Sequence, residues 1–218
     1  MQFKVWLAES ELKSKQDTWI TSVHSDDIPK FIHPRILSDK LGSAVEMAMQ
    51  LAEEYDLPKP IRKIDEGTQA HIFDTKDPNI ILRISNDDVR NSCEKIIEKP
   101  EFQATGGVNV VYKVIRKDKL LFSWKEKVIV NWLDDLTAKY KYDRKKTDAL
   151  FNLESLNRFA EHEEALARLL NTLRTIPETE NIVSAIELGI PTDDVTGHNL
   201  GLSKPDSKFP NSIQVIDC

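Results

Sequence analysis

Apolar residues recur at intervals of three and four positions over residues 44 to 55, a spacing typical of an amphipathic helix with one buried face. Ser43 and Glu46 have the spacing of a capping box and place the start of this helix at residue 43. The segment "LPKP" at 57 to 60 ends it, because proline cannot continue a helix. The positions of the apolar face are Val45, Ala48, Leu51, Ala52 and Tyr55.

The pattern then changes to short segments rich in β-branched and aromatic residues, which is typical of strands. Residues 71–75 and 79–85 flank the turn-forming tripeptide "KDP" and predict a β-hairpin. Residues 108–115 and 120–128 flank the charged turn "RKDK" and predict a second hairpin. The first half of the chain should therefore be rich in β-structure.

Helical patterns separate and follow these hairpins. Residues 87–99 have one apolar helical face, and Pro100 is expected to end the helix and begin a loop. After residue 128 the pattern is almost entirely helical, with an apolar stripe from 156 to 176. The last segments, "HNLGLS" and "SIQVIDC", are short apolar alternations that predict a small hairpin. The fold class is therefore α+β.

Composition narrows the function. The 218 residues carry a formal net charge of -6 with Lys and Arg scattered among Asp and Glu, so no basic stripe indicates a nucleic-acid partner. No apolar stretch is long enough to cross a bilayer, so no membrane role is expected. Cys93 and Cys218 are the only cysteines, which favours a reducing, cytoplasmic location, and the five dispersed histidines lack the spacing of zinc ligands.

The stretch "DDVTGHNLGLS" at 193 to 203 contains candidate catalytic and metal-binding residues. Asp194 is followed five residues later by Asn199, and the predicted small hairpin ends in Asp217. This order, after two hairpins and a helical region, resembles the protein-kinase-like superfamily, including the abbreviated kinases of phages and bacteria. The resemblance covers residues 61–218.

The resemblance implies a two-lobed kinase-like fold. Residues 61–128 would form a β-rich N-lobe, and residues 129–218 a short, truncated α-rich C-lobe with the catalytic loop and the metal-binding hairpin. Residues 1–60 would be an N-terminal extension packed on or near the N-lobe.

The resemblance also implies roles for the polar residues near the end of the chain. Asp194 would be the catalytic base, although Asp193 is an alternative, because Thr192 and Asp193 stand where protein kinases have His and Arg. Asn199 and Asp217 would bind Mg²⁺ through oxygen atoms. We expect no activation segment or peptide-docking subdomain after Asp217.

In the first half, the same resemblance assigns residues to ATP. Gly67 is the single glycine in the position of the phosphate-binding loop, and Arg83 replaces the usual lysine on the strand that contacts the phosphates. Glu94 is expected to pair with Arg83, with Glu98 and Glu101 as alternatives. The adenine ring is expected at the backbone of Glu126 to Val128.

These assignments predict a phosphotransferase that uses ATP and Mg²⁺, with a protein Ser/Thr hydroxyl as the acceptor. A small-molecule kinase is an alternative acceptor class. A kinase-shaped protein that has lost catalysis and acts by binding a partner protein is a second alternative, which the reduced phosphate loop allows. An unrelated α+β interaction domain is the third.

Overall fold

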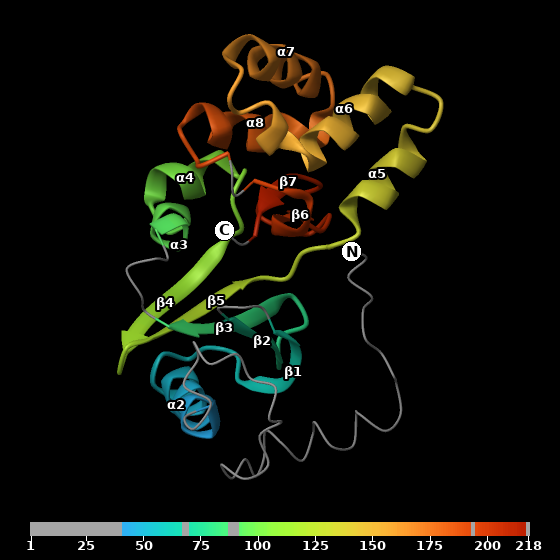
Figure 1. The fold of residues 1–218 in the computed structure, drawn as a ribbon. Helices are drawn as coiled ribbons and strands as arrows, with labels where there is room; N and C mark the ends of the chain where they lie inside the picture. Colours follow the sequence, from blue (N-terminus) through green and yellow to red (C-terminus); the bar gives the residue numbers. More distant parts are fainter. Residues whose placement is uncertain (1–40, 67–69, 87–91, 193–194, 217–218) are drawn as a thin grey trace. The chain divides into compact units, whose positions relative to one another are not determined.

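The computed structural model describes residues 41–66, 70–86, 92–192 and 195–216. In these residues the chain has an α+β fold: a five-stranded antiparallel sheet, a helical region and a small two-stranded sheet (Figure 1). The chain divides into two compact units. The described residues 41–86 and 112–125 belong to the first, and 92–111 and 126–216 to the second. The segment 92–111, which was expected in the N-lobe, therefore groups with the helical unit.

The sheet of the first unit has the strand order β1-β2-β3-β5-β4. β2 and β3 pair antiparallel, with Phe73 opposite Leu82, and β4 and β5 are neighbours, so the positions of both predicted hairpins are confirmed. The strands are β1 (Pro60–Glu66), β2 (Ala70–Thr75), β3 (Ile80–Asn86), β4 (Val111–Lys117) and β5 (Leu120–Glu126).

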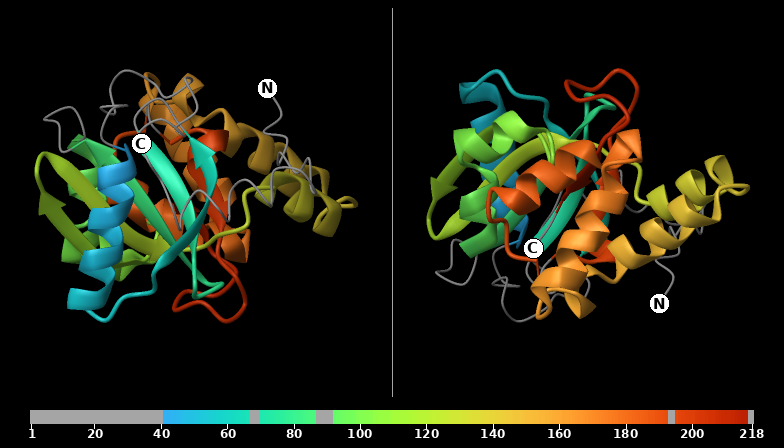
Figure 2. Two further views of the ribbon diagram at one scale, coloured as in Figure 1. Left: turned by 90° about the horizontal axis from the view of Figure 1, so that it is seen from below. Right: turned by 90° about the horizontal axis from the view of Figure 1, so that it is seen from above.

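Helix α2 (Leu41–Glu54) covers one face of this sheet (Figure 2). Its apolar side packs with Phe73, Leu82 and Trp124, each fully buried. The helix was predicted correctly, but its start was not. It already includes Leu41, so Ser43 lies inside the helix and is not its N-cap. The apolar side chains that alternate along the strands pack against this helix, so the sheet and the helix share a hydrophobic core of their own.

The second unit is mainly helical, and its core is formed by side chains from its α-helices, from η3 and from the small sheet. Pro100 does not begin a loop. It is the first residue of α4, where its fixed φ and missing N–H suit a helix start. The stripe from 156 to 176 is not one helix, because residues 155–162 form a short 3-10 segment and turns. The elements are α3 (Ser92–Ile97), α4 (Pro100–Thr105), α5 (Trp132–Lys139), α6 (Arg144–Glu154), η3 (Leu156–Arg158), α7 (Glu163–Leu173), η4 (Pro177–Thr179) and α8 (Glu180–Glu187).

The predicted small hairpin is present in the second unit. η5 (Gly197–Asn199) leads directly into β6 (Leu200–Leu202), which pairs antiparallel with β7 (Ile213–Val215). Leu200, Leu202 and Val215 face the helical core. Among the described residues, none of the helices combines the length and the apolar composition that crossing a bilayer requires.

Candidate functional site

The β6–β7 hairpin fixes the position of Asn199. The carbonyl oxygen of Asn199 accepts a hydrogen bond from the N–H of Ile216 at 2.8 Å, and its own N–H donates to the carbonyl of Thr196 at 2.8 Å. Asn199 therefore lies at the open end of the hairpin, bonded to the residue that precedes Asp217 in the chain. Asp217 itself lies outside the described residues.

The loop before Asn199 is held from outside the hairpin. The indole N–H of Trp132, at the start of α5, donates to the carbonyl of Gly197 at 3.2 Å. A Cβ atom on Gly197 would lie 2.5 Å from Cγ of Glu154, so glycine allows this close approach. Val195 is fully buried. Asp193 and Asp194, between the helical region and this anchored segment, are outside the described residues.

Two further segments, 107–110 and 126–129, form main-chain hydrogen bonds with the two outer edges of the hairpin, and the four segments together make a closed ring. Ile129 exchanges both main-chain bonds with Leu202 of β6, each at 2.8 Å. On the other side, Val215 of β7 donates to Gly107 at 3.0 Å and accepts from Asn109 at 2.8 Å. We call the four segments 107–110, 126–129, β6 and β7 the hinge ring.

One further contact closes the hinge ring. The N–H of Glu126 donates to the carbonyl of Val110 at 2.9 Å, and the Asn109 amide donates to the carbonyl of Glu126 at 3.1 Å. Both main-chain groups of Glu126 are therefore bonded inside the protein. A ligand that needs main-chain hydrogen bonds from this segment must find them at other residues.

The Glu126 side chain is also occupied. It is 4 % exposed, and its Oε2 accepts a hydrogen bond from the Ser207 hydroxyl at 2.8 Å. Burial raises the pKa of the Glu126 carboxyl, the Ser207 hydrogen bond offsets part of that rise, and the negative charge of Asp206 adds to it. This contact ties the loop between β6 and β7 to the end of β5.

Val128 differs from Glu126 in the state of its main-chain hydrogen-bonding groups. Within the described part of the chain, neither its N–H nor its carbonyl has a hydrogen-bond partner. Its side chain lies over Gly201 of β6, where an added Cβ would come within 2.4 Å of Val128 Cγ2. A planar base could thus exchange a donor and an acceptor with Val128 main-chain atoms. Of the residues predicted for adenine, Val128 fits this role best.

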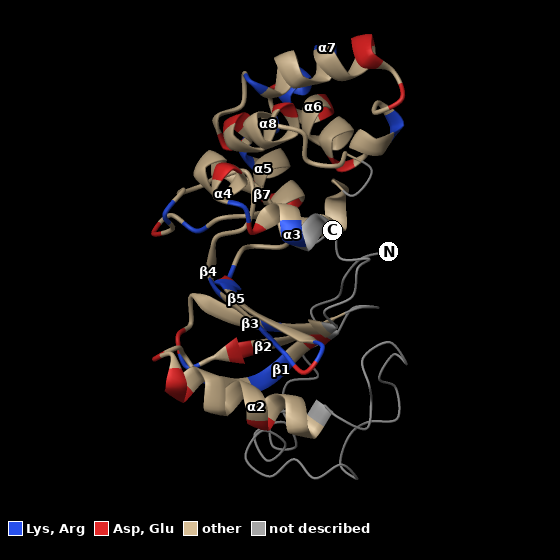
Figure 3. Ribbon diagram, turned by 90° about the vertical axis from the view of Figure 1, so that its left-hand side faces the viewer, with Lys and Arg blue, Asp and Glu red and all other residues tan. Residues whose placement is uncertain are grey.

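In the first unit, the sheet face opposite α2 carries buried polar side chains among apolar ones. Arg83 and Ser85 alternate with the core residues of β3, and Lys125 alternates with those of β5. Arg83 is 4 % exposed and Lys125 is 1 % exposed, and Arg83 donates to the Ser85 hydroxyl at 3.0 Å. This face therefore has two buried cationic side chains, although charges elsewhere are mixed along both units (Figure 3). Gly67 lies outside the described residues.

The three candidate partners of Arg83 differ in exposure. Glu94 is in α3, but its side chain is outside what the structure describes. Glu98, just after α3, is half-buried, and Glu101 at the start of α4 is exposed. Arg83 belongs to the first unit and the three glutamates to the second, so which of them pairs with Arg83 stays a prediction.

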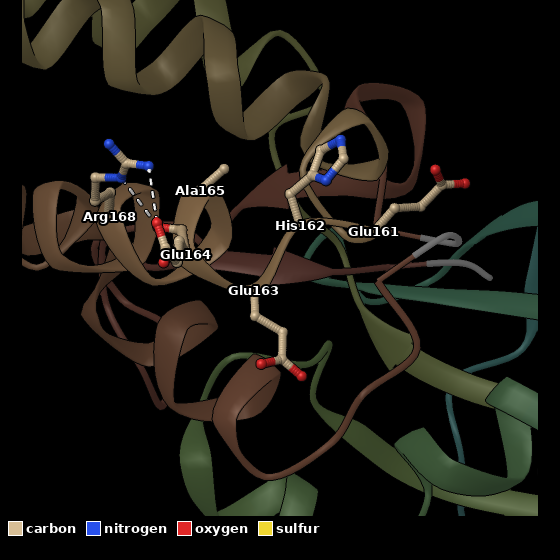
Figure 4. A pocket seen from close by; sticks show the side chains of 6 residues that line it. All are labelled: Glu161, His162, Glu163, Glu164, Ala165 and Arg168. Atoms are coloured by element: carbon tan, nitrogen blue, oxygen red, sulfur yellow. Dashed lines mark hydrogen bonds and ion pairs between the residues drawn. The ribbon is translucent and has the colours of Figure 1, made fainter.

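A shallow depression of about 470 Å³ lies at the start of α7 (Figure 4). Its one ion pair, Arg168 with Glu164 at 3.6 Å, joins two exposed side chains and contributes little. The depression therefore has no buried polar group to orient a ligand. Its lining residues are Glu161, His162, Glu163, Glu164, Ala165 and Arg168.

An amide oxygen from Asn199 and a carboxylate from Asp217 would by their chemistry suit a hard cation, and the metal site remains a prediction because Asp217 lies outside the described residues. Among the described residues, His, Cys, Asp and Glu form no group of three that could hold a metal.

No protein-family model matches the chain, and no curated protein is found to be similar to it.

The sequence singled out Arg83, Glu126, Val128 and Asn199 but missed two residues. Lys125 adjoins Glu126 in sequence, and its alternation with Trp124 is a signal that could have placed it on the Arg83 face. Gln214, the polar residue between Ile213 and Val215, could have been placed opposite the core in the same way. The hinge ring brings Glu126, Val128 and Asn199 into one connected structure.

Proposed function

We propose that the chain is a protein-kinase-like phosphotransferase that uses ATP and Mg²⁺ and phosphorylates a protein Ser/Thr hydroxyl. One observation carries the proposal: Asn199, the candidate metal ligand, is hydrogen-bonded to Ile216, the residue before the second candidate ligand, Asp217. Asn199 and the residue that precedes Asp217 in the chain are thus bonded to each other at one end of the hairpin. An accidental Asp-to-Asn spacing in a polar loop does not require this pairing.

The other residues would bind the nucleotide. The main-chain groups of Val128 suit adenine, and the guanidinium of Arg83, whose flat fork matches phosphate oxygens, suits the α- and β-phosphates. Lys125 adds a second positive charge on the same sheet face as Arg83. Mg²⁺, when bound by Asn199 and Asp217, would neutralise charge on the phosphates.

Transfer itself needs one proton acceptor. The acceptor hydroxyl oxygen forms a bond to the γ-phosphorus while the bond from that phosphorus to the β,γ-bridging oxygen breaks. Asp194 takes the hydroxyl proton, and ADP leaves with the electron pair of the broken bond. The protein's contribution is to hold the two reactants in line and balance their charge.

The test incubates the full chain with Mg²⁺, γ-labelled ATP and a mixed Ser/Thr protein acceptor such as casein. Asp194→Ala, Asn199→Ala and Asp217→Ala should each reduce labelling by about hundredfold or more, the usual scale for a catalytic acid–base group or a lost metal ligand. Asp148→Ala on α6 and Asn171→Ala on α7, both exposed, are matched controls and should label normally. Thermal shifts with Mg·ATP are recorded for all variants.

The outcomes separate the alternatives. Stabilisation by ATP without any transfer would favour the kinase-shaped binding protein. Transfer to small hydroxylated compounds but not to protein would favour a small-molecule kinase. Neither stabilisation nor transfer would contradict the proposal and leave an α+β interaction domain.

A further inference from the structure

Gln214 in β7 has a buried side chain with no evident structural task. It is 0 % exposed, and neither its amide nitrogen nor its carbonyl oxygen has a hydrogen-bond partner among the residues that the structure describes. A buried polar atom without a partner costs roughly 1–3 kcal/mol, so native proteins seldom retain one without a use. The neighbouring Ser203 and Ser212 both have partners, which makes Gln214 an exception on its own hairpin.

The hinge ring determines which way Gln214 faces. It is paired with Gly201 across the hairpin, and directly paired residues share one face of a sheet. Ile213 and Val215 face the helical core, so Gln214 and Gly201 lie on the other face. Val128 covers that same face at Gly201. The Gln214 amide therefore borders the residue whose main-chain groups suit a nucleobase.

The absence of a side chain at Gly201 matters here. A Cβ at this position would approach Val128 Cγ2 within 2.4 Å and Ile216 Cγ2 at 3.0 Å. With glycine, the Val128 side chain can lie directly over β6 beside the Gly201–Gln214 pair, on a face that the Ile216 side chain also borders. Val128 and Gln214 are thus both neighbours of Gly201.

We infer that Gln214 is a specificity residue that reads the nucleobase and makes the site selective for adenine over guanine. This inference rests on the proposed function. A carboxamide offers one donor and one acceptor, which match the N7 acceptor and the 6-amino donor of adenine. Guanine presents two acceptors, N7 and O6, on that edge, so the Gln214 carbonyl would face O6 without a proton between them.

The experiment measures binding without transfer. The full chain is titrated with Mg·ADP and Mg·GDP by calorimetry, as the wild type and as Gln214→Met, which keeps the length of the side chain and removes both polar atoms. The wild type should prefer ADP. The preference for ADP over GDP should fall by about 5- to 150-fold in Gln214→Met, the scale of one bidentate base contact.

Two controls separate recognition from folding. Ser212→Ala changes the same face of the hairpin two pairs further from Asn199 and should leave the preference unchanged. Without nucleotide, Gln214→Met should melt at the wild-type temperature or above it, because the change removes two unsatisfied polar atoms. If Gln214→Met does not fold, Gln214→Asn retains the amide, withdraws it by one methylene and should also lose preference.

The results distinguish this inference from the proposed function. A wild type that binds ADP, with an equal preference in the folded Gln214 variant, overturns the role of Gln214 and leaves the phosphotransferase intact. A wild type that binds neither nucleotide overturns both. Preference lost in Gln214→Met but kept in Ser212→Ala supports Gln214 as the residue that reads the base.

Discussion

At the scale of single residues, Glu126 shows that a side chain in a candidate site can reduce stability. Its carboxyl is buried and accepts a hydrogen bond from the Ser207 hydroxyl, and burial raises its pKa above the ordinary value of 4.5. The folded state therefore prefers the protonated form. Its contribution to stability is fully present below pH 4.5 and is lost as the pH rises through the folded pKa.

Glu126→Gln should therefore stabilise the protein at pH 8, since the amide oxygen can still accept from Ser207 without the cost of a buried charge. We expect a rise in Tm of about 2–4 °C, the shift that ~1 kcal/mol gives in a protein of this size. The gain should shrink as the pH is lowered towards 4.5. Thermal melts from pH 4 to 8 measure it, and a lower Tm for the variant at pH 8 would contradict the argument.

At the scale of elements, a buried carboxylate joins α5 to η4. Glu178 in η4 is 4 % exposed, forms an ion pair with Lys139 at the end of α5, and accepts from the Tyr140 hydroxyl at 2.8 Å. Burial alone would raise the pKa of Glu178, but the hydrogen bonds from Lys139 and Tyr140 lower it overall. Burial and the bond to Glu178 raise the pKa of Tyr140.

Glu178→Ala should lower the stability at pH 7 by about 1–3 kcal/mol, because it leaves a half-buried tyrosine hydroxyl without its acceptor. The pKa of Glu178 is lowered, so its contribution is present above pH 4.5 and is lost as the pH falls through the folded value. Denaturant unfolding at pH 7 and pH 3 should show a smaller difference at pH 3. Glu161→Gln, on an exposed turn, is the control, and a Glu178→Ala variant as stable as that control would refute the coupling.

The elements that the sequence predicted are those whose signal is local. Both strand pairs and α2 follow from alternation and spacing within about ten residues. The helix beginning at Pro100 was missed, because a proline fits a helix start as well as a loop. The start of α2 was misplaced for a similar reason, since a capping-box spacing at Ser43 also occurs inside a helix.

The hinge ring shows what a local pattern cannot reveal. Its bonds join Val110 to Glu126 and Ile129 to Leu202, residues that are far apart in sequence. Asn199 could be singled out as a candidate because its neighbours carry a recognisable spacing, and its role stays a prediction. The hydrogen bonds of the Glu126 main chain and the burial of Gln214 both depend on such distant contacts. Neither feature has a signal in the nearby sequence.

At the scale of the whole molecule, the two units have separate cores, and each contains one described tryptophan. Trp124 is fully buried in the core of α2 and the sheet, and Trp132 is 1 % exposed in the core of the second unit. Among the residues that the structure describes, more apolar side chains are buried in the second core, so their burial contributes more free energy there. We therefore expect the first unit to unfold at a lower denaturant concentration.

Single-tryptophan proteins test this expectation. With Trp6 and Trp19 replaced by phenylalanine, Trp132→Phe leaves Trp124 as the reporter, and Trp124→Phe leaves Trp132. Of Trp124 and Trp132, each variant replaces the one in the other unit, so the described core around the reporting tryptophan keeps its side chains. Urea titrations followed by fluorescence should give a lower midpoint for Trp124 than for Trp132, and circular dichroism of either variant should show both transitions. Coincident midpoints would mean that the units unfold as one cooperative structure, because two independent cores of unequal size cannot share a single transition unless they are strongly coupled.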